Sequence, residues 1–221
     1  MQNLSPRYLE VDEIWTYCAK KQRRIRKTET PDEIGDQYIF VSIDADTKLI
    51  PSFCIGKRTA KTTYKFVEDL YARMAPAHRA QLTTDGYIFY RSAVPDSFGT
   101  DVDFAQLTKL FNYGQLDTPD ARYSPPRITE VISKVYQGHP DPERISTSYI
   151  ERQNLTMRMQ MRRLTRFTNA YSKKLANLKA AVALHFAFYN FCRVHSSLRV
   201  SPAVEAGLTD HIWSVRELLS I

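Results

Sequence analysis

The sequence predicts an α/β fold in one domain-sized chain of 221 residues. Residues 9–55 hold short runs of β-branched and aromatic side chains separated by polar loops, which is typical of strands. Residues 62–74 repeat apolar side chains at the 3.6-residue period of an amphipathic helix. From Ser148 onward the pattern is helical again, so the strands precede the longest helices.

Each element can be placed by its pattern. We expect strands over residues 9–18, 38–44, 49–55 and 80–84, with a hairpin turn at residues 45–48. We expect helices over residues 62–74, 148–168 and 172–193, and one or two helical turns over residues 87–93. Residues 98–147 are rich in Asp, Pro, Gly and Tyr and predict an irregular insertion before the helix that starts at Ser148. The domain would then cover residues 1–208, with a basic loop at 20–36 and a tail at 209–221.

Positive charge is concentrated in two places. The chain carries 31 basic and 24 acidic residues, for a net charge of +7. Six of the eight residues in 20–27 are basic, and residues 144–179 hold nine basic residues and one acid, Glu151. A mildly acidic body with two basic surfaces suits a polyanion such as DNA, because phosphate contacts release counterions. A solvated charged helix face is the alternative interpretation.

Several classes of protein are excluded or disfavoured. No apolar run approaches the roughly 18 residues of a membrane span, and the first residues lack the apolar stretch of a signal peptide. The three cysteines are far apart and the five histidines form no i, i+4 pair, which argues against a disulfide framework and a zinc site. We therefore expect a cytoplasmic protein without a membrane partner.

Three acids stand at suggestive places: Asp12 in the first strand, Asp85 after the fourth, and Glu151 near the start of the helix over 148–168. On an ideal helix Arg158 and Arg162 lie about 20° to either side of Glu151, which would set a carboxylate and guanidinium groups on one face. Each acid also has a structural explanation. Ser148 and Glu151 match a capping box, and Asp85-Gly86 is an ordinary turn pair.

The acids occur within motifs that, taken together, resemble a known family. These are VDEIWTY at residues 11–17, TTDG at 83–86, IERQN at 150–154 and YNFCRVH at 189–195. Over residues 10–208 the chain resembles the DDE transposases of bacterial insertion sequences, and in particular the IS-one-like group. The resemblance implies a ribonuclease H-like fold, a mixed sheet flanked by helices in which the first and fourth strands are neighbours.

The resemblance also implies the chemistry. Asp12, Asp85 and Glu151 would be the catalytic residues and would bind two Mg²⁺ ions, for which Mn²⁺ is expected to substitute. The reaction would be cleavage at the ends of the element followed by strand transfer of the 3′-hydroxyl into target DNA. Asp44 and Asp46 are rival acids, and Asp44 is a candidate substitute only. Asn190, Arg193 and His195 match a family segment that helix packing explains equally well.

The expected partner is double-stranded DNA, both the element ends and the target, within the bacterial nucleoid. The side chains expected to contact the DNA backbone are Lys20, Lys21, Arg23, Arg24, Arg152, Asn154, Arg158, Arg162, Arg163 and Arg166. The resemblance further implies a homodimer or higher assembly. Since eleven residues precede Asp12, either a separate polypeptide supplies the module that recognises element ends, or the chain is a truncated product that kept its catalytic core. The alternatives are a truncated DNA-binding remnant without catalysis and a host nuclease of the same fold.

Overall fold

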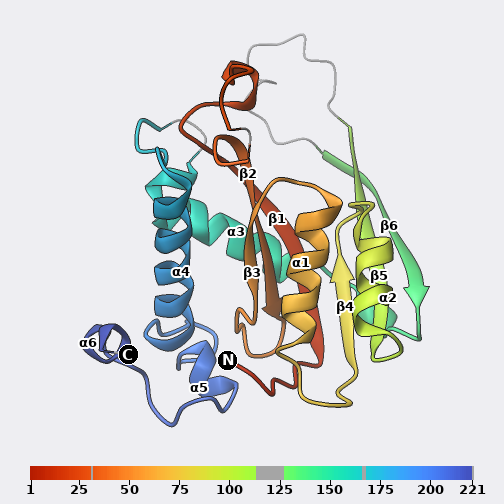
Figure 1. Cartoon of the computed structure of the whole chain (residues 1–221). Coiled ribbons are helices and arrows are strands. Elements are labelled where there is room, and N and C mark those ends of the chain that lie inside the picture. The colour runs from red at the N-terminus through yellow and green to blue at the C-terminus, as the bar shows by residue number, and fades with distance from the viewer. Residues whose placement is uncertain (31, 113–126, 166–167, 221) are drawn as a thin grey trace.

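The computed structural model describes residues 1–30, 32–112, 127–165 and 168–220. Its centre is a six-stranded sheet with the order β3-β2-β1-β4-β5-β6 (Figure 1). The strands are β1 (Tyr8–Cys18), β2 (Gly35–Asp44), β3 (Phe53–Gly56), β4 (Ala80–Thr84), β5 (Val102–Asn112) and β6 (Arg127–Gln137). The first three strands pair antiparallel, β4 lies parallel to both β1 and β5, and β6 is antiparallel to β5. The sheet is therefore mixed.

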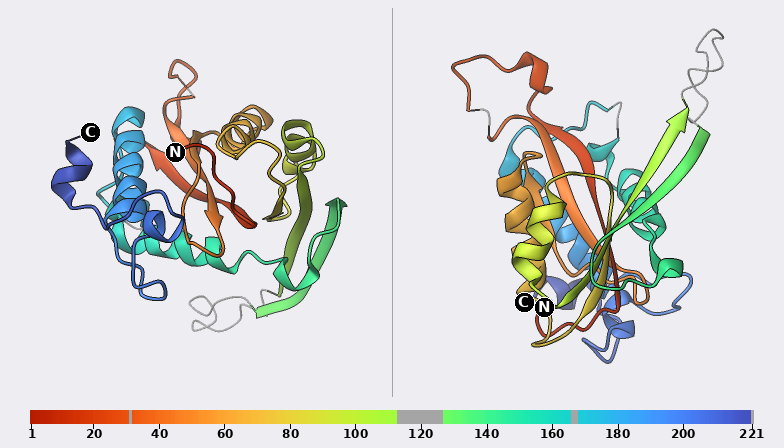
Figure 2. Two further views of the ribbon diagram at one scale, coloured as in Figure 1. Left: turned by 90° about the horizontal axis from the view of Figure 1, so that it is seen from below. Right: turned by 90° about the vertical axis from the view of Figure 1, so that its right-hand side faces the viewer.

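Helices cover both faces of the sheet (Figure 2). The helices are α1 (Ala60–Tyr71), α2 (Tyr90–Phe98), α3 (Ser148–Gln160), α4 (Leu175–Phe191), α5 (Pro202–Glu205) and α6 (Val215–Leu219). One buried cluster joins α1 and α2 to the sheet through side chains such as Phe66 and Tyr90. A second joins α3 and α4 to β1 and β2 through side chains such as Met157 and Phe186. The α/β prediction is confirmed.

The alternation of β1 distributes its side chains between these layers. Leu9 and Val11 belong to the cluster under α1 and α2, whereas Ile14 belongs to the cluster under α3 and α4. Asp12 accordingly lies on the α3 side, and Glu13 lies on the α2 side. The strand thus carries adjacent acids toward opposite layers.

Two predicted elements agree closely with the structure. The strand predicted over residues 80–84 is β4, and the helix predicted over 62–74 is α1, which starts two residues earlier and ends three earlier. Thr59 caps α1 by accepting a bond from the amide of Thr62. Phe66, Val67 and Leu70 are buried along the predicted apolar stripe.

The prediction of an irregular insertion over residues 98–147 is wrong for its described part. β5 and β6 are strands of 11 residues each, and they extend the sheet beyond β4. The sequence of β6, RITEVISKVYQ, is rich in β-branched residues, which favour strands. The mean composition of the segment hides these runs. Residues 113–126 lie outside the described part of the chain.

The helix predicted over residues 148–168 is shorter than expected. α3 ends at Gln160, and Met161 adopts an extended conformation before a 3₁₀ turn over Arg162–Leu164. Met161 and Leu164 are both buried in the core under α3 and α4, so tertiary packing turns the chain here. Arg162 therefore does not continue the helical face that carries Glu151 and Arg158.

The longest helix, α4, has 17 residues and matches most of the segment predicted over 172–193. Leu178, Val182 and Phe186 are buried on its inner face. Among the described helices, none combines the length and apolar character needed to cross a membrane.

Candidate active site

A cavity of about 430 Å³ opens where β4 ends between two longer strands. β1 pairs with β4 only as far as Val11 opposite Thr84, and β5 pairs with β4 only as far as Gln106. Beyond these positions β1 and β5 continue while β4 stops, which leaves a notch in the sheet. We call this cavity the acidic cavity. Its lining includes the three predicted catalytic acids and comprises Asp12, Arg58, Asp85, Gly86, Tyr87, Ile88, Leu107, Thr108, Lys109, Thr147 and Glu151.

Asp12 stands on the wall formed by β1. Its Oδ1 accepts a bond of 2.8 Å from the amide of Glu13, and its Oδ2 accepts one of 2.9 Å from Nδ2 of Asn154. Burial raises the pKa of the Asp12 carboxyl to about 7, and the Asp85 carboxylate adds to the rise. A carboxyl group with this pKa releases its proton near neutral pH, or at a lower pH when a cation stabilises the carboxylate.

Asp85 lies at the floor of the notch, directly after β4. Its Oδ1 accepts a bond of 3.0 Å from the amide of Tyr87, and its Oδ2 is 3.5 Å from Nη2 of Arg58. Burial raises its pKa as well. A Cβ at Gly86 would lie 2.8 Å from Oγ1 of Thr108. The turn interpretation of Asp85-Gly86 is thus correct, and the same turn presents the carboxylate to the cavity.

Glu13 is an acid of this site that the sequence analysis missed. Carboxylate oxygens of Asp12, Glu13 and Asp85 all lie within 4.8 Å of one another, because β1 has no β4 neighbour there to separate its two faces. The Glu13 side chain is only 2% exposed. Its Oε2 accepts a bond of 3.0 Å from Nε of Arg58, and its Oε1 accepts one from the Tyr90 hydroxyl.

The pKa of Glu13 reflects how closely the three carboxylates of Asp12, Glu13 and Asp85 lie together. Burial is the main cause that raises it, to about 8, and the Asp85 carboxylate acts in the same direction. Tyr90 and Arg58 oppose the rise. The sequence offers one indication that Glu13 belongs to the site: it follows Asp12 directly within the same strand.

Glu151 lines the same cavity from α3 but stands apart from the three clustered acids. Its carboxylate accepts a bond of 2.8 Å from Oγ1 of Thr147 and forms an ion pair with Lys109 of β5. The predicted capping box is wrong, because the N-cap residue is Thr147 and its side chain makes no capping bond. The Glu151 side chain is 48% exposed, so it faces the opening of the cavity.

Two buried contacts hold α3 against β1. Asn154 joins the helix to Asp12, and the Glu10 carboxylate accepts a bond of 2.9 Å from the amide of Ile150 at the start of the helix. Burial raises the pKa of Glu10, although the backbone amides of Ile150 and Tyr149 act to lower it. Asn154 was expected to contact DNA, but its side chain is buried and is directed at Asp12.

The rival acids lie elsewhere. Asp44 accepts bonds from Oγ1 of Thr47 and from the amide of Asp46, and so stabilises the turn after β2. Asp46 pairs with Arg7 at 3.0 Å. Neither acid is among the residues that line the acidic cavity.

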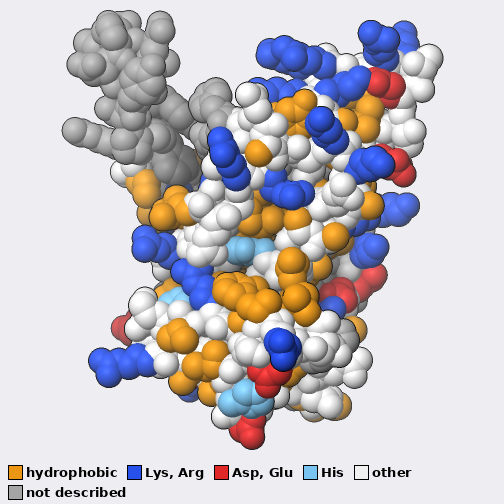
Figure 3. Space-filling view, turned by 90° about the vertical axis from the view of Figure 1, so that its left-hand side faces the viewer, with side chains coloured by type: hydrophobic (Ala, Val, Ile, Leu, Met, Phe, Trp, Pro, Cys, Tyr) orange, Lys and Arg blue, Asp and Glu red, His pale blue; other side chains and the backbone are white. Residues whose placement is uncertain are grey.

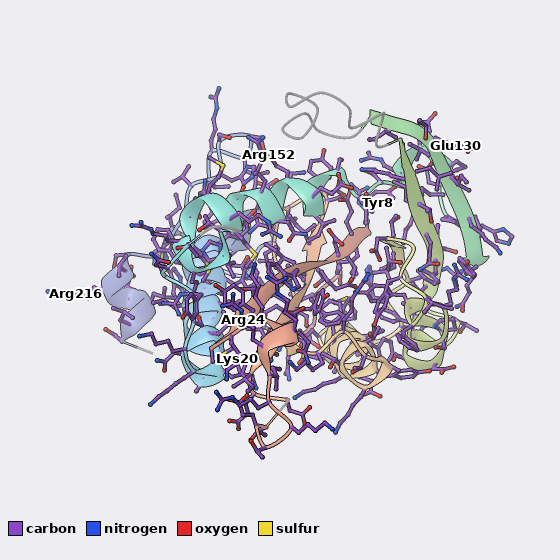
Figure 4. All side chains as sticks on the ribbon, turned by 90° about the horizontal axis from the view of Figure 1, so that it is seen from above. Tyr8, Lys20, Arg24, Glu130, Arg152 and Arg216 are labelled. Carbon is purple, nitrogen blue, oxygen red and sulfur yellow. The ribbon has the colours of Figure 1, made fainter. Side chains whose placement is uncertain are left out.

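The expected DNA-contacting residues differ in their exposure. Arg23 and Arg24 are exposed on the 3₁₀ turn Gln22–Arg24 after β1, and Lys21 is exposed just before that turn. Arg152 and Arg162 are exposed on or after α3. Basic side chains gather toward one end of the face in Figure 3, and Figure 4 places Arg152 on α3, with Lys20 and Arg24 away from that helix.

The remaining basic residues of that set have partners within the chain. Lys20 forms an ion pair with Glu29. Nη1 of Arg158 donates to the Leu164 carbonyl, and Nη1 of Arg163 donates to Oγ of Ser172. Arg166 lies outside the described residues.

The sequence was also compared with known proteins. It matches no protein-family model and no curated protein. The motifs and the geometry of the acidic cavity are therefore the indications of function in this chain.

Proposed function

We propose that this chain is the catalytic core of a DDE-type transposase with a ribonuclease H-like fold. It would cleave DNA at the ends of an insertion sequence and join the freed 3′-hydroxyl to target DNA. One observation carries the proposal: Asp12 and Asp85, 73 positions apart in the sequence, lie side by side at the acidic cavity, and Glu151 reaches the same cavity from a helix.

The topology supports the fold part of the proposal. Three antiparallel strands lead into a parallel pairing of β1 with β4, and helices lie on both faces. This arrangement makes the first and fourth strands neighbours, as the family resemblance implies.

The donor set fits a hard divalent cation. Carboxylate oxygens are the ligands that Mg²⁺ and Mn²⁺ prefer, and like charges gathered this closely are stabilised by a cation. Asp12 and Asp85 would hold the metal, with Glu151 or Glu13 as a further ligand. A bound Mg²⁺ supplies Lewis acidity at the phosphate and lowers the pKa of a bound water or hydroxyl.

The protein's own residues would prepare this site. Asn154 orients Asp12, while Arg58 keeps Asp85 and Glu13 together by pairing with both. Arg58 and Lys109 are also the cations that a metal ion or a DNA phosphate would meet in the cavity. The exposed Arg152 and Arg162 near α3 and Lys21, Arg23 and Arg24 after β1 would bind backbone phosphates.

The test is a cleavage and strand-transfer assay with Mg²⁺ or Mn²⁺ on duplexes taken from the DNA that flanks the gene. We expect Asp12→Asn, Asp85→Asn and Glu151→Gln to abolish both steps. Asp46→Asn is the matched control, because it removes an acid outside the acidic cavity, and it should retain both. Full activity of Asp12→Asn or Asp85→Asn would contradict the proposal.

A second candidate is DNA binding without catalysis. Two ion pairs favour it, since Arg58 pairs with Asp85 and Lys109 pairs with Glu151, which offsets the charge that a metal requires. Isothermal titration with Mn²⁺ separates the two candidates. Binding that disappears in Asp12→Asn and persists in Asp46→Asn supports the catalytic function, whereas salt-sensitive DNA binding without metal binding supports the second.

A further inference from the structure

β6 forms the outer edge of the sheet, with β5 as its neighbour on one side (Figures 1 and 2). Its 11 residues make it as long as β1 and β5. No described strand or helix pairs with its other side. An exposed strand edge offers unpaired backbone groups to another strand, and proteins usually protect such edges.

The side chains of β6 do not provide this protection. Val131, Ile132 and Val135 remain 43–52% exposed. Ile132 and Val131 follow one another in the strand, so both faces of the edge are apolar. Between Glu130 and Val135 the register with β5 is regular, and the irregularities lie outside this stretch. The edge is therefore regularly paired on its inner side and apolar over the stretch where another strand would add to it.

Two charges lie within the same stretch. Glu130 and Lys134 are both exposed, and neither forms an ion pair with another described residue. Figure 4 shows Glu130 on β6 at the margin of the molecule. The Lys134 ammonium lies 5.1 Å from the centre of the Tyr136 ring, on its own strand. Both charges are thus available to a partner.

The spacing of these charges selects a partner and a register. Two identical strands can pair antiparallel about a twofold axis that is perpendicular to the sheet. Directly opposed side chains then point to the same face only if the axis passes between two copies of the same residue. With the axis at Ile132, Glu130 of each copy lies opposite Lys134 of the other. With the axis at Val131 or Ser133, neither charge meets its opposite. Opposite charges directly across an antiparallel pair are stabilising.

We propose that β6 pairs with β6 of a second copy of this chain, antiparallel and centred on Ile132, so that two six-stranded sheets join into one. The apolar side chains of both copies then cover each other, and the two Glu130–Lys134 pairs fix the register. This inference is independent of the proposed catalytic function.

The first test is the dissociation constant of the full chain, measured by sedimentation equilibrium. Glu130→Lys alone places Lys opposite Lys twice, and Lys134→Glu alone places Glu opposite Glu twice. Each should raise the constant by about tenfold or more, and the double exchange Glu130→Lys with Lys134→Glu should restore it. Glu68→Lys and Lys61→Glu reverse exposed charges on α1 and are the matched controls.

The second test fixes the position of the axis. In a Cys54→Ser, Cys192→Ser background, Ile132→Cys should form an intermolecular disulfide, because directly paired residues have Cα atoms about 4.5–5.5 Å apart. Ser92→Cys, on the exposed side of α2, should not. A monomeric wild-type chain, single reversals without effect, a double exchange that fails to restore pairing, or equal crosslinking at both positions would overturn the proposal.

Discussion

Asn154 donates a bond of 2.9 Å from its Nδ2 to Oδ2 of Asp12 and so fastens α3 to β1 at the edge of the acidic cavity. The Asn154 Oδ1 is buried and has no partner among the described residues. The bond that the Asn154 side chain makes among the described residues is thus the one to the Asp12 carboxylate. Helix α3 therefore does more than carry Glu151, because through Asn154 it also orients Asp12 on β1.

Replacing this amide should weaken both the fold and the site. We expect Asn154→Ala to lower the free energy of unfolding by about 2 kcal/mol at a pH above 7, where Asp12 is ionised, because a buried bond to a charged group is lost. Urea denaturation measures the change. Asn177→Ala, which alters an exposed side chain on α4, should change it little. A difference of less than a few tenths of a kcal/mol between the two variants would show that the bond contributes nothing.

Arg58 should be important for stability because it pairs with two acids. Removing it in Arg58→Met leaves Glu13 buried beside Asp85, and we expect a loss of about 2 kcal/mol after allowance for the partial exposure of Arg58. Adding Glu13→Gln should recover part of that loss, because the repulsion is then reduced. A double-mutant cycle by thermal or urea unfolding gives the coupling. Strict additivity would contradict the expected interaction.

Acid should destabilise the protein through His185. Burial, with Arg193 as a smaller cause, lowers the pKa of His185 from 6.5 to about 4. Between these pH values the unfolded chain binds more protons than the folded one, so stability is complete above pH 6.5 and falls as the pH drops toward 4.

The variant His185→Leu removes this titration. Its stability should fall less between pH 6.5 and pH 4 than that of the wild type, by roughly 2 kcal/mol. His139→Gln, at an exposed position, should keep the wild-type slope. Urea unfolding at a series of pH values measures the difference, and parallel curves for His185→Leu and the wild type would exclude His185 as the cause.

DNA binding should depend on the exposed basic residues and on salt. Arg152→Ala and Arg162→Ala are each expected to weaken binding to duplex DNA and to reduce the slope of log K against log salt concentration by about 1. Fluorescence anisotropy at several salt concentrations measures the slope. Arg216→Ala is the control, because Figure 4 places Arg216 on α6, away from α3. An equal effect of Arg216→Ala would indicate a nonspecific charge effect.

The elements that the sequence predicted best are those with a local cause. β4 lies between polar segments, and α1 has both a cap at Thr59 and a regular apolar stripe. α3 was predicted too long because its end is set by the burial of Met161 and Leu164, which is a tertiary effect. β5 and β6 were missed because their strand patterns lie within a segment of mixed composition.

The site was predictable only in part for a similar reason. The resemblance placed Asp12 and Asp85 on neighbouring strands, and the structure brings them together. Glu13, Arg58 and Lys109 join them through contacts between distant parts of the chain, which no local pattern encodes. Asn154 lies in a motif that predicts a surface role, whereas its burial depends on how α3 packs on β1.

The five-residue length of β4 has a consequence for how this protein can vary. The position of Asp85 along the sheet is set by the point where β4 stops, and the residues that follow it line the cavity and orient its carboxylate. Insertions immediately after Asp85 would disturb the turn in which the Tyr87 amide orients the Asp85 carboxylate. Two added residues in β4 itself would close the notch with backbone, so the length of this strand, as well as its sequence, determines whether the site exists.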